Sequence, residues 1–168
     1  MGFGACALRI LRLNSKRLAT YSRITFADVS KGMLAVVEEK ISRMNVKNVD
    51  AVLLDLTRDP PPPGRFGLLV TLMALHHVPD VDGILRAFHS TLEPGGVLCI
   101  SDLDREDGSF HGPGVDVHPG FDRLALEGKI RGAGFGPVRF STPCEVRKEV
   151  EGQVRTYPIF LAIAERLE

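Results

Sequence analysis

Two acidic residues follow apolar, β-branched segments, where a carboxylate can bind a nucleoside. Asp28 comes just after Ile24–Phe26, and Asp55 comes directly after Val49–Leu54. A carboxylate at the end of a parallel strand can accept hydrogen bonds from both hydroxyls of a ribose, and the next helix offers free backbone N–H groups. An exocyclic amine can donate to the second acid. Each acid can equally be an ordinary helix or turn cap, because Asp favours both places.

Glycines near the N-terminus suggest a second contact with a ligand. Gly2 and Gly4 begin the segment Gly2–Ala7, which matches the pattern G-x-G-x-x-[G/A]. Such glycines let a phosphate or a carboxylate approach the backbone at the start of a helix. Together with Asp28, the pattern is also compatible with a nicotinamide-dependent oxidoreductase, although only Met1 precedes the glycines where that pattern requires a strand.

Alternating apolar patterns predict strands and helices that position these residues. The last two strands, which flank the charged connector Glu145–Arg155, are expected to form an antiparallel hairpin. The result is a three-layer α/β fold. Its sheet is mainly parallel and contains one antiparallel strand. We expect strands at Ile24–Phe26, Val49–Leu54, Phe66–Leu72, Val97–Ser101, Val138–Cys144 and Tyr157–Ala164, and helices at Lys31–Met44, Val81–Leu92 and Phe121–Gly132.

Ligands of such sheets bind beyond the carboxyl ends of the strands. Asp28, Asp55 and Leu72–His77 all come at such ends, so we expect them to face one nucleoside crevice. The irregular segment Asp104–Pro119 is typical of a lid or binding loop. The proline run Asp59–Gly64 is expected to be a rigid connector, and Glu93–Gly96 a tight turn.

Composition limits the classes of function. The chain has 168 residues, 44% of them hydrophobic, and no formal net charge, which favours one domain over residues 1–168 and argues against nucleic acid as a partner. No apolar run is long enough to span a membrane. Three widely spaced cysteines without a CxxC pair indicate reduced thiols, so we expect no metal site.

The first 23 residues are basic and amphipathic and contain no acid. Such a segment is typical either of a first helix of the domain or of a mitochondrial transit peptide. We therefore expect a cytoplasmic protein, with the mitochondrion as the alternative.

Histidines are candidate general bases by residue type. They are His76, His77, His111 and His118. His76 and His77 can equally be wall and capping residues of a turn, and no catalytic residue is assigned.

Several longer motifs occur together in the chain. The most specific is the pair formed by Leu75-His76-His77-Val78-Pro79-Asp80 and Leu92-Glu93-Pro94-Gly95-Gly96. The others are Asp28-Val29-Ser30 with Gly32-Met33-Leu34, Asp55-Leu56-Thr57, Gly120-Phe121-Asp122-Arg123 and Ala133-Gly134-Phe135. Over residues 24–165, these motifs resemble those of class I S-adenosylmethionine-dependent methyltransferases of the ubiquinone/menaquinone-biosynthesis-like group.

The resemblance implies S-adenosylmethionine as the cofactor and assigns roles to several residues. Asp28 would hold the ribose hydroxyls, Val29 would pack on the adenine, and Asp55 with Leu56 would flank the adenine amine. Leu72 would line the methionine side. Independently of the resemblance, the place of Met33 at the start of the predicted helix is compatible with contact to a nucleoside, with core packing as the alternative.

The family opens with a central strand and a glycine-rich loop, and the chain departs from this pattern. Gly2 and Gly4 would be the remnant of the loop, so we expect an N-terminally truncated version of the fold. A missing central strand exposes two rows of backbone donors and acceptors unless another chain pairs with them. We expect methyl transfer to a small-molecule acceptor, impaired by the incomplete loop. The alternative is an inactive methyltransferase-like protein that forms homo- or hetero-oligomers through this sheet edge.

Overall fold

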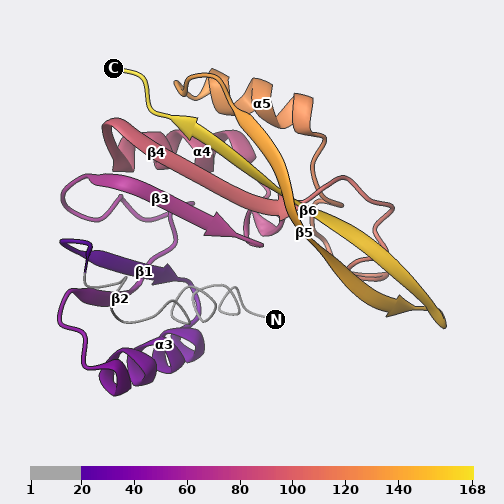
Figure 1. Ribbon diagram of the computed structural model, residues 1–168, viewed down its shortest axis with the longest axis horizontal. Helices are drawn as coiled ribbons and strands as arrows, with labels where there is room; N and C mark the ends of the chain where they lie inside the picture. Colours follow the sequence, from indigo (N-terminus) through magenta and orange to yellow (C-terminus); the bar gives the residue numbers. More distant parts are fainter. Residues whose placement is uncertain (1–19) are drawn as a thin grey trace. The chain divides into compact units, whose positions relative to one another are not determined.

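The computed structural model describes residues 20–168. The chain divides into two compact units, residues 1–59 and 60–168, and each is described by itself (Figure 1). The predicted single domain stays a prediction. Gly2, Gly4 and most of the basic segment 1–23 lie outside the described residues. No helix within residues 20–168 combines the length and apolar character that a membrane span requires.

The first unit is a strand–helix–strand motif. Strand β1 (Ile24–Asp28) and strand β2 (Val49–Leu53) pair in parallel, with Ile24 opposite Val49 and Asp28 opposite Leu53. Helix α3 (Lys31–Met44) connects them, as predicted to the residue. Ser30 caps its start by accepting a hydrogen bond from the Met33 N–H, and Asn45 ends it in a left-handed conformation.

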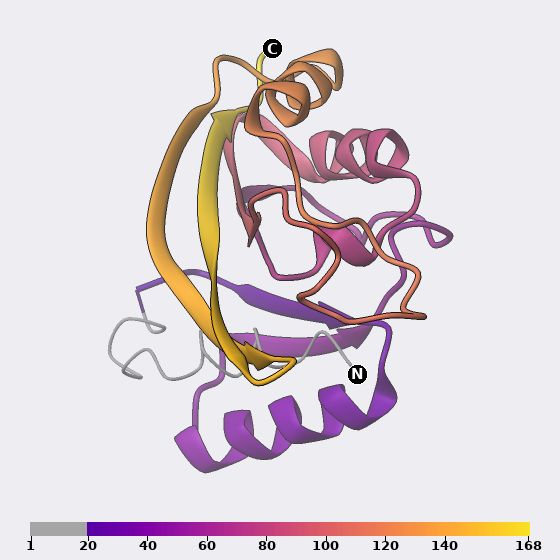
Figure 2. The same cartoon turned by 90° about the vertical axis from the view of Figure 1, so that its right-hand side faces the viewer.

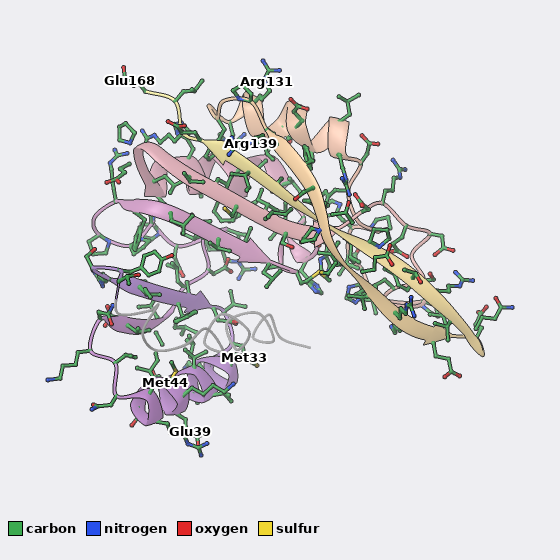
Figure 3. All side chains as sticks on the ribbon, in the orientation of Figure 1. Met33, Glu39, Met44, Arg131, Arg139 and Glu168 are labelled. Atoms are coloured by element: carbon green, nitrogen blue, oxygen red, sulfur yellow. The ribbon has the colours of Figure 1, made fainter. Side chains whose placement is uncertain are left out.

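A small core holds this unit together. Phe26, Val37 and Val49 are buried, one from each element, and partly buried side chains such as Met44 pack against them. Met33 and Met44 lie at opposite ends of α3 (Figure 3). Met33 therefore lies at the end of the helix that follows Asp28.

The second unit contains a four-stranded sheet in the order β3-β4-β6-β5. Strand β3 pairs in parallel with β4, whereas β6 runs antiparallel to both β4 and β5. The predicted fold class, a largely parallel sheet with one antiparallel strand in a C-terminal hairpin, is confirmed. The elements are β3 (Phe66–Leu72), the 3₁₀ helix η1 (Leu75–His77), α4 (Val81–Thr91), β4 (Leu92–Leu103), α5 (Arg123–Gly132), β5 (Arg139–Val150) and β6 (Gln153–Glu165).

Helices α4 and α5 lie on one face of this sheet (Figure 2). Leu98 and Ile100 share one face of β4 and are buried, as are Leu85 of α4 and Leu126 of α5. The strand alternation places Leu68 and Val70 of β3 on the opposite face, where they are 43% and 48% exposed. Strand β3 is therefore exposed on one face within the second unit.

Two predictions about the strands were wrong. Residues Glu93–Gly96, predicted as a tight turn before a strand, form a bulge within β4, because Phe66 pairs with Leu92 and Leu68 pairs with Val97. A side chain at Gly96 would lie 2.8 Å from the Glu93 carbonyl oxygen, so only glycine fits this bulge. Most of the charged span Glu145–Arg155 belongs to β5 and β6 rather than to a connector.

The described strands form two sheets rather than one. Within residues 20–168, β1 pairs only with β2, and β3 pairs only with β4. No strand within residues 20–168 joins the two sheets. This is expected when the central strand of the predicted fold is not among these residues.

Candidate functional site

Asp28 lies at the carboxyl end of β1 and is held by the start of the next helix. Its side chain is 8% exposed, and its Oδ1 atom accepts a hydrogen bond from the Ser30 N–H at 2.8 Å. The backbone of β2 is bonded to the same residue, since the Leu54 N–H donates to the Asp28 carbonyl at 3.2 Å. The carboxylate is thus fixed in orientation, and its two oxygens have further acceptor capacity.

Asp55 lies just beyond the carboxyl end of the adjacent strand β2. Its Oδ1 atom accepts hydrogen bonds from the Thr57 hydroxyl at 2.5 Å and from the Thr57 N–H at 3.0 Å. These bonds cap a turn, which is the alternative role expected from the sequence. The hydrogen bond from the Thr57 hydroxyl lowers the pKa of Asp55. At neutral pH this carboxylate is therefore charged, and it acts as a hydrogen-bond acceptor and not as a donor.

The parallel register places both acids at the same edge of the two-stranded sheet. Asp28 pairs with Leu53, and Asp55 follows two residues later. Val29, predicted to pack on an adenine, is 51% exposed beside Asp28, and Leu56 beside Asp55 is half-buried. Recognition of a nucleoside requires a hydrogen-bond acceptor for the ribose and an apolar side chain for the base. The Asp28 carboxylate and the Val29 side chain are groups of these two kinds, so they fit the predicted cofactor.

The other predicted residues of the site divide between the two units. Met33 lies in the first turn of α3 and is half-buried. Leu72 ends β3 in the second unit, where it pairs with Ser101 of β4. Met73 follows with a φ of 52°, a conformation that side chains other than glycine rarely adopt, and its N–H donates to the Ser101 carbonyl at 2.8 Å. This turn directs the chain into η1.

A buried His–Asp pair lies beyond the carboxyl ends of β3 and β4. His76 Nδ1 is 2.5 Å from Asp102 Oδ1, and both side chains are almost completely buried. Asp102 also accepts hydrogen bonds from the backbone N–H groups of His76, at 3.2 Å, and Leu103, at 2.8 Å. Because a carboxylate only accepts, the His76 Nδ1 atom carries the proton of this bond.

Two neighbouring histidines are shifted toward their neutral form. Burial lowers the pKa of His77 to about 4, and the nearby His76 and His111 contribute to this shift. Burial also lowers the pKa of His111, with a further contribution from His76. At neutral pH both rings are therefore uncharged, and each carries a proton on one of its two nitrogens.

The sequence alone did not reveal the His76–Asp102 pair. His76 was expected to be either a candidate base or a wall or capping residue, and Asp102 follows the predicted strand Val97–Ser101 without an assigned role. The rule that places ligand-binding residues at the carboxyl ends of adjacent parallel strands would have connected them. It applies here because Leu72 and Ser101 are partners in the β3–β4 register.

The sequence matches a methyltransferase domain family over residues 2–96. The chain is 32% identical to an uncharacterized methyltransferase of Schizosaccharomyces pombe over 133 residues, which cover 74% of this chain and 45% of that protein. It is 26% identical to a ubiquinone/menaquinone biosynthesis C-methyltransferase of Pseudoalteromonas translucida, over 69% of this chain and 46% of that protein. It thus spans about half the length of these curated relatives.

The fold is shared with a solved structure. A methyltransferase candidate from Bacillus halodurans superposes with a TM-score of 0.73 at 14% identity, over 98% of this chain and 99% of that chain. The family match, together with this fold, assigns the chain to the class I S-adenosylmethionine-dependent methyltransferases. The chain belongs to this methyltransferase family, and S-adenosylmethionine is the cofactor of the class, as the sequence motifs predicted.

Proposed function

We propose that the chain transfers a methyl group from S-adenosylmethionine to a small-molecule acceptor, and that the carboxyl edge of the β1–β2 sheet holds the nucleoside of the cofactor. The observation that carries this proposal is the parallel register of these strands, which brings Asp28 and Asp55 to one edge. Membership of the methyltransferase family supports the reaction class.

Each residue at this edge has a distinct task in the proposal. Asp28 accepts hydrogen bonds from the two ribose hydroxyls, and Ser30 holds its carboxylate in place for this contact. Val29 and Met33 contact the nucleoside with apolar side chains. Asp55, kept charged by Thr57, accepts from the adenine amine beside Leu56. The role of Leu72 stays a prediction from the family resemblance. Gly2 and Gly4 are assigned to the methionine carboxylate by the family resemblance alone.

The reaction requires that the methyl donor and the acceptor are aligned. S-adenosylmethionine supplies an electrophilic methyl group on a sulfonium sulfur. The protein must hold the acceptor in line with it, and fixed orientation alone can account for most of the required rate increase. The hydrogen bond from the Ser30 N–H serves this purpose, because it fixes the Asp28 carboxylate before the cofactor and the acceptor bind.

Calorimetric titration of the full chain with S-adenosylhomocysteine tests the proposed site. We expect micromolar binding, and we expect Asp28→Ala to weaken it by ~1–3 kcal/mol because an acceptor for two hydroxyls is lost. Asp50→Ala is the matched control. Asp50 lies on β2 but is exposed and pairs with Arg23 at 2.9 Å, so its loss should leave the affinity unchanged. Unchanged affinity in Asp28→Ala would remove Asp28 from the site.

The same titration separates the competing functions. Binding of NAD without S-adenosylhomocysteine would support an oxidoreductase instead. Binding of neither would support the alternative of an inactive methyltransferase-like interaction protein. That alternative is favoured by one observation, namely that β1 and β3 each have a single strand partner within the described residues. Sedimentation analysis would then reveal a homo-oligomer.

The acceptor is the finer part of the proposal. The name of the Pseudoalteromonas relative refers to ubiquinone and menaquinone biosynthesis, which makes demethylated quinone-type aromatics the first compounds to test. Transfer of a labelled methyl group from S-adenosylmethionine to such a compound is the direct assay. Transfer only to a different small-molecule class would keep the reaction and replace the acceptor.

A further inference from the structure

Three histidine rings meet in the second unit of the chain. The ring centres of His76 and His77 are 4.2 Å apart, and that of His111 lies 5.0 Å and 5.1 Å from them. One ring nitrogen of each histidine lies within 4.8 Å of the others, and the Nε2 atoms of His76 and His111 are 3.0 Å apart. The nitrogens therefore converge on one point.

Asp102 gives this cluster a fixed direction. It holds the Nδ1 proton of His76, so the Nε2 lone pair of His76 faces His111. A histidine that binds a metal through one nitrogen commonly donates its other N–H to a carboxylate, which fixes the tautomer and raises the basicity of the ligand. The His76–Asp102 pair has this arrangement, and Asp102 is completely buried.

The loop that supplies His111 is bonded to the rest of the cluster. The His118 N–H donates to the His76 carbonyl at 2.9 Å, and His118 Nε2 lies 3.0 Å from the Val78 carbonyl oxygen. On the other side of His111, the Ser109 hydroxyl is 2.7 Å from the Tyr157 hydroxyl, and Lys148 donates to the Phe110 carbonyl. The third histidine is thus positioned by both η1 and the β5–β6 hairpin.

We propose that His76, His77 and His111 bind a divalent transition-metal ion of the zinc class. Three imidazoles without a thiolate favour Zn²⁺, Ni²⁺ or Cu²⁺ over Mg²⁺ and Ca²⁺, which prefer oxygen ligands. Zn–N bonds of about 2.0–2.1 Å in a tetrahedron separate the nitrogens by ~3.3 Å. The ring nitrogens lie within 4.8 Å of one another, so the partly buried rings of His77 and His111 must rotate toward His76 when a metal binds. Three protein ligands leave a fourth position for an oxygen ligand.

This site departs from the expectation that the chain binds no metal. That expectation rested on the cysteines, which are widely spaced. The three histidines follow no short motif, because His111 is 35 residues from His76 in the sequence. Only the packing of the loop against η1 brings them together. The site does not depend on the proposed methyl transfer, and its test uses the metal alone.

Titration of the tag-free, metal-free full chain with Zn²⁺ tests this proposal, with the shift in Tm as a second readout. We expect one equivalent to bind with a rise in Tm, because a ligand that binds only the folded state stabilises it. His77→Gln and His111→Gln should weaken binding at least about 10-fold, the lower limit known for loss of even an outer-shell partner. Both histidines are only partly buried, so these variants keep the buried His76–Asp102 pair.

His118→Gln is the matched control. It changes a histidine of the same loop, and glutamine retains an N–H that can donate to the Val78 carbonyl. Its Zn²⁺ affinity should equal that of the parent chain. Equal affinity in all three variants, or no binding to the parent chain, would overturn the proposal.

Co²⁺ supplies a test of the ligand atoms. Visible absorption of a tetrahedral Co²⁺ complex that disappears in His77→Gln and His111→Gln would support the site. A thiolate-to-metal band would assign the metal to a cysteine, such as the exposed Cys144, and would also overturn the proposal.

Discussion

The two units fix their polar groups in different ways. In the first unit, Asp28 bonds to Ser30 and Asp55 bonds to Thr57, each only two residues away. In the second unit, His76 bonds to Asp102 across 26 residues and to His111 across 35. The acids of the first unit are thus oriented by local turns and caps, whereas the histidines of the second unit are oriented only when strands and a loop have packed.

The two candidate sites should therefore respond differently to the loss of one hydrogen bond. A local bond survives as long as one turn forms, and its loss costs about as much as a helix cap. A buried long-range pair depends on the whole unit, and removal of one partner leaves the other polar group without compensation.

The largest expected effect comes from Asp102→Ala. This change leaves the His76 ring and two backbone N–H groups without their buried acceptor, so we expect the free energy of unfolding to fall by about 3–5 kcal/mol. Urea unfolding followed by circular dichroism measures it. Asp107→Ala, at an exposed acid that follows in the next loop, should change the unfolding midpoint little. A loss below ~1 kcal/mol in Asp102→Ala would contradict the contrast between the units.

Leu126→Ala tests the core beneath α5. Leu126 is 1% exposed between α5 and the sheet, and its truncation should cost about 2–5 kcal/mol. Leu124 lies on the same helix and is 78% exposed, so Leu124→Ala should stay within ~0.5 kcal/mol. Similar losses in the two variants would mean that α5 does not pack as described.

Ser30→Ala measures the local cap of the first unit. The change removes the acceptor for the Met33 N–H and should cost about 1 kcal/mol in urea unfolding. Ser42→Ala, at an exposed position of the same helix, should be neutral or slightly stabilising, because alanine favours helices. A loss in Ser30→Ala as large as that of Asp102→Ala would remove the contrast between local and long-range bonds.

The last prediction concerns pH and belongs to the second unit alone. All five histidines lie in residues 60–168, and burial lowers the pKa values of His77, His89 and His111. As the pH falls below about 6.5, the unfolded chain binds protons that the folded chain binds only at lower pH, near 4 for His77. Stability of the metal-free chain should therefore be complete above pH 6.5 and fall between pH 6.5 and 4.

Thermal unfolding between pH 7 and pH 4.5 checks this sign. His77→Gln should flatten the dependence, because glutamine does not titrate. A Tm that rises as the pH falls through this range would contradict the lowered pKa values.

Much of the fold could be predicted where local signals agree. Helix α3 has apolar residues at helical spacing, a Ser cap and a left-handed Asn at its end, so its bounds follow from the sequence. Strand β3 was also predicted to the residue. The long β5–β6 hairpin was underestimated, because beyond β4 it is a two-stranded ribbon with charged residues on exposed faces. Such strands lack the alternation that a buried face imposes.

The candidate sites divide in the same way. The positions of Asp28 and Asp55 at the ends of neighbouring parallel strands were anticipated, and their roles toward a cofactor stay predictions. The His76–Asp102 pair and its contact with His111 were missed, because the loop that carries His111 has no regular pattern.

The sequence by itself determined the helices, their caps and the acids that follow the first two strands, because these depend on neighbours within a few residues. Only the tertiary structure decided the strand order β3-β4-β6-β5, the bulge at Gly96 and the meeting of three histidines around a buried Asp102. Such contacts join residues far apart in the chain, and their geometry exists only after the sheet and its loop have packed together.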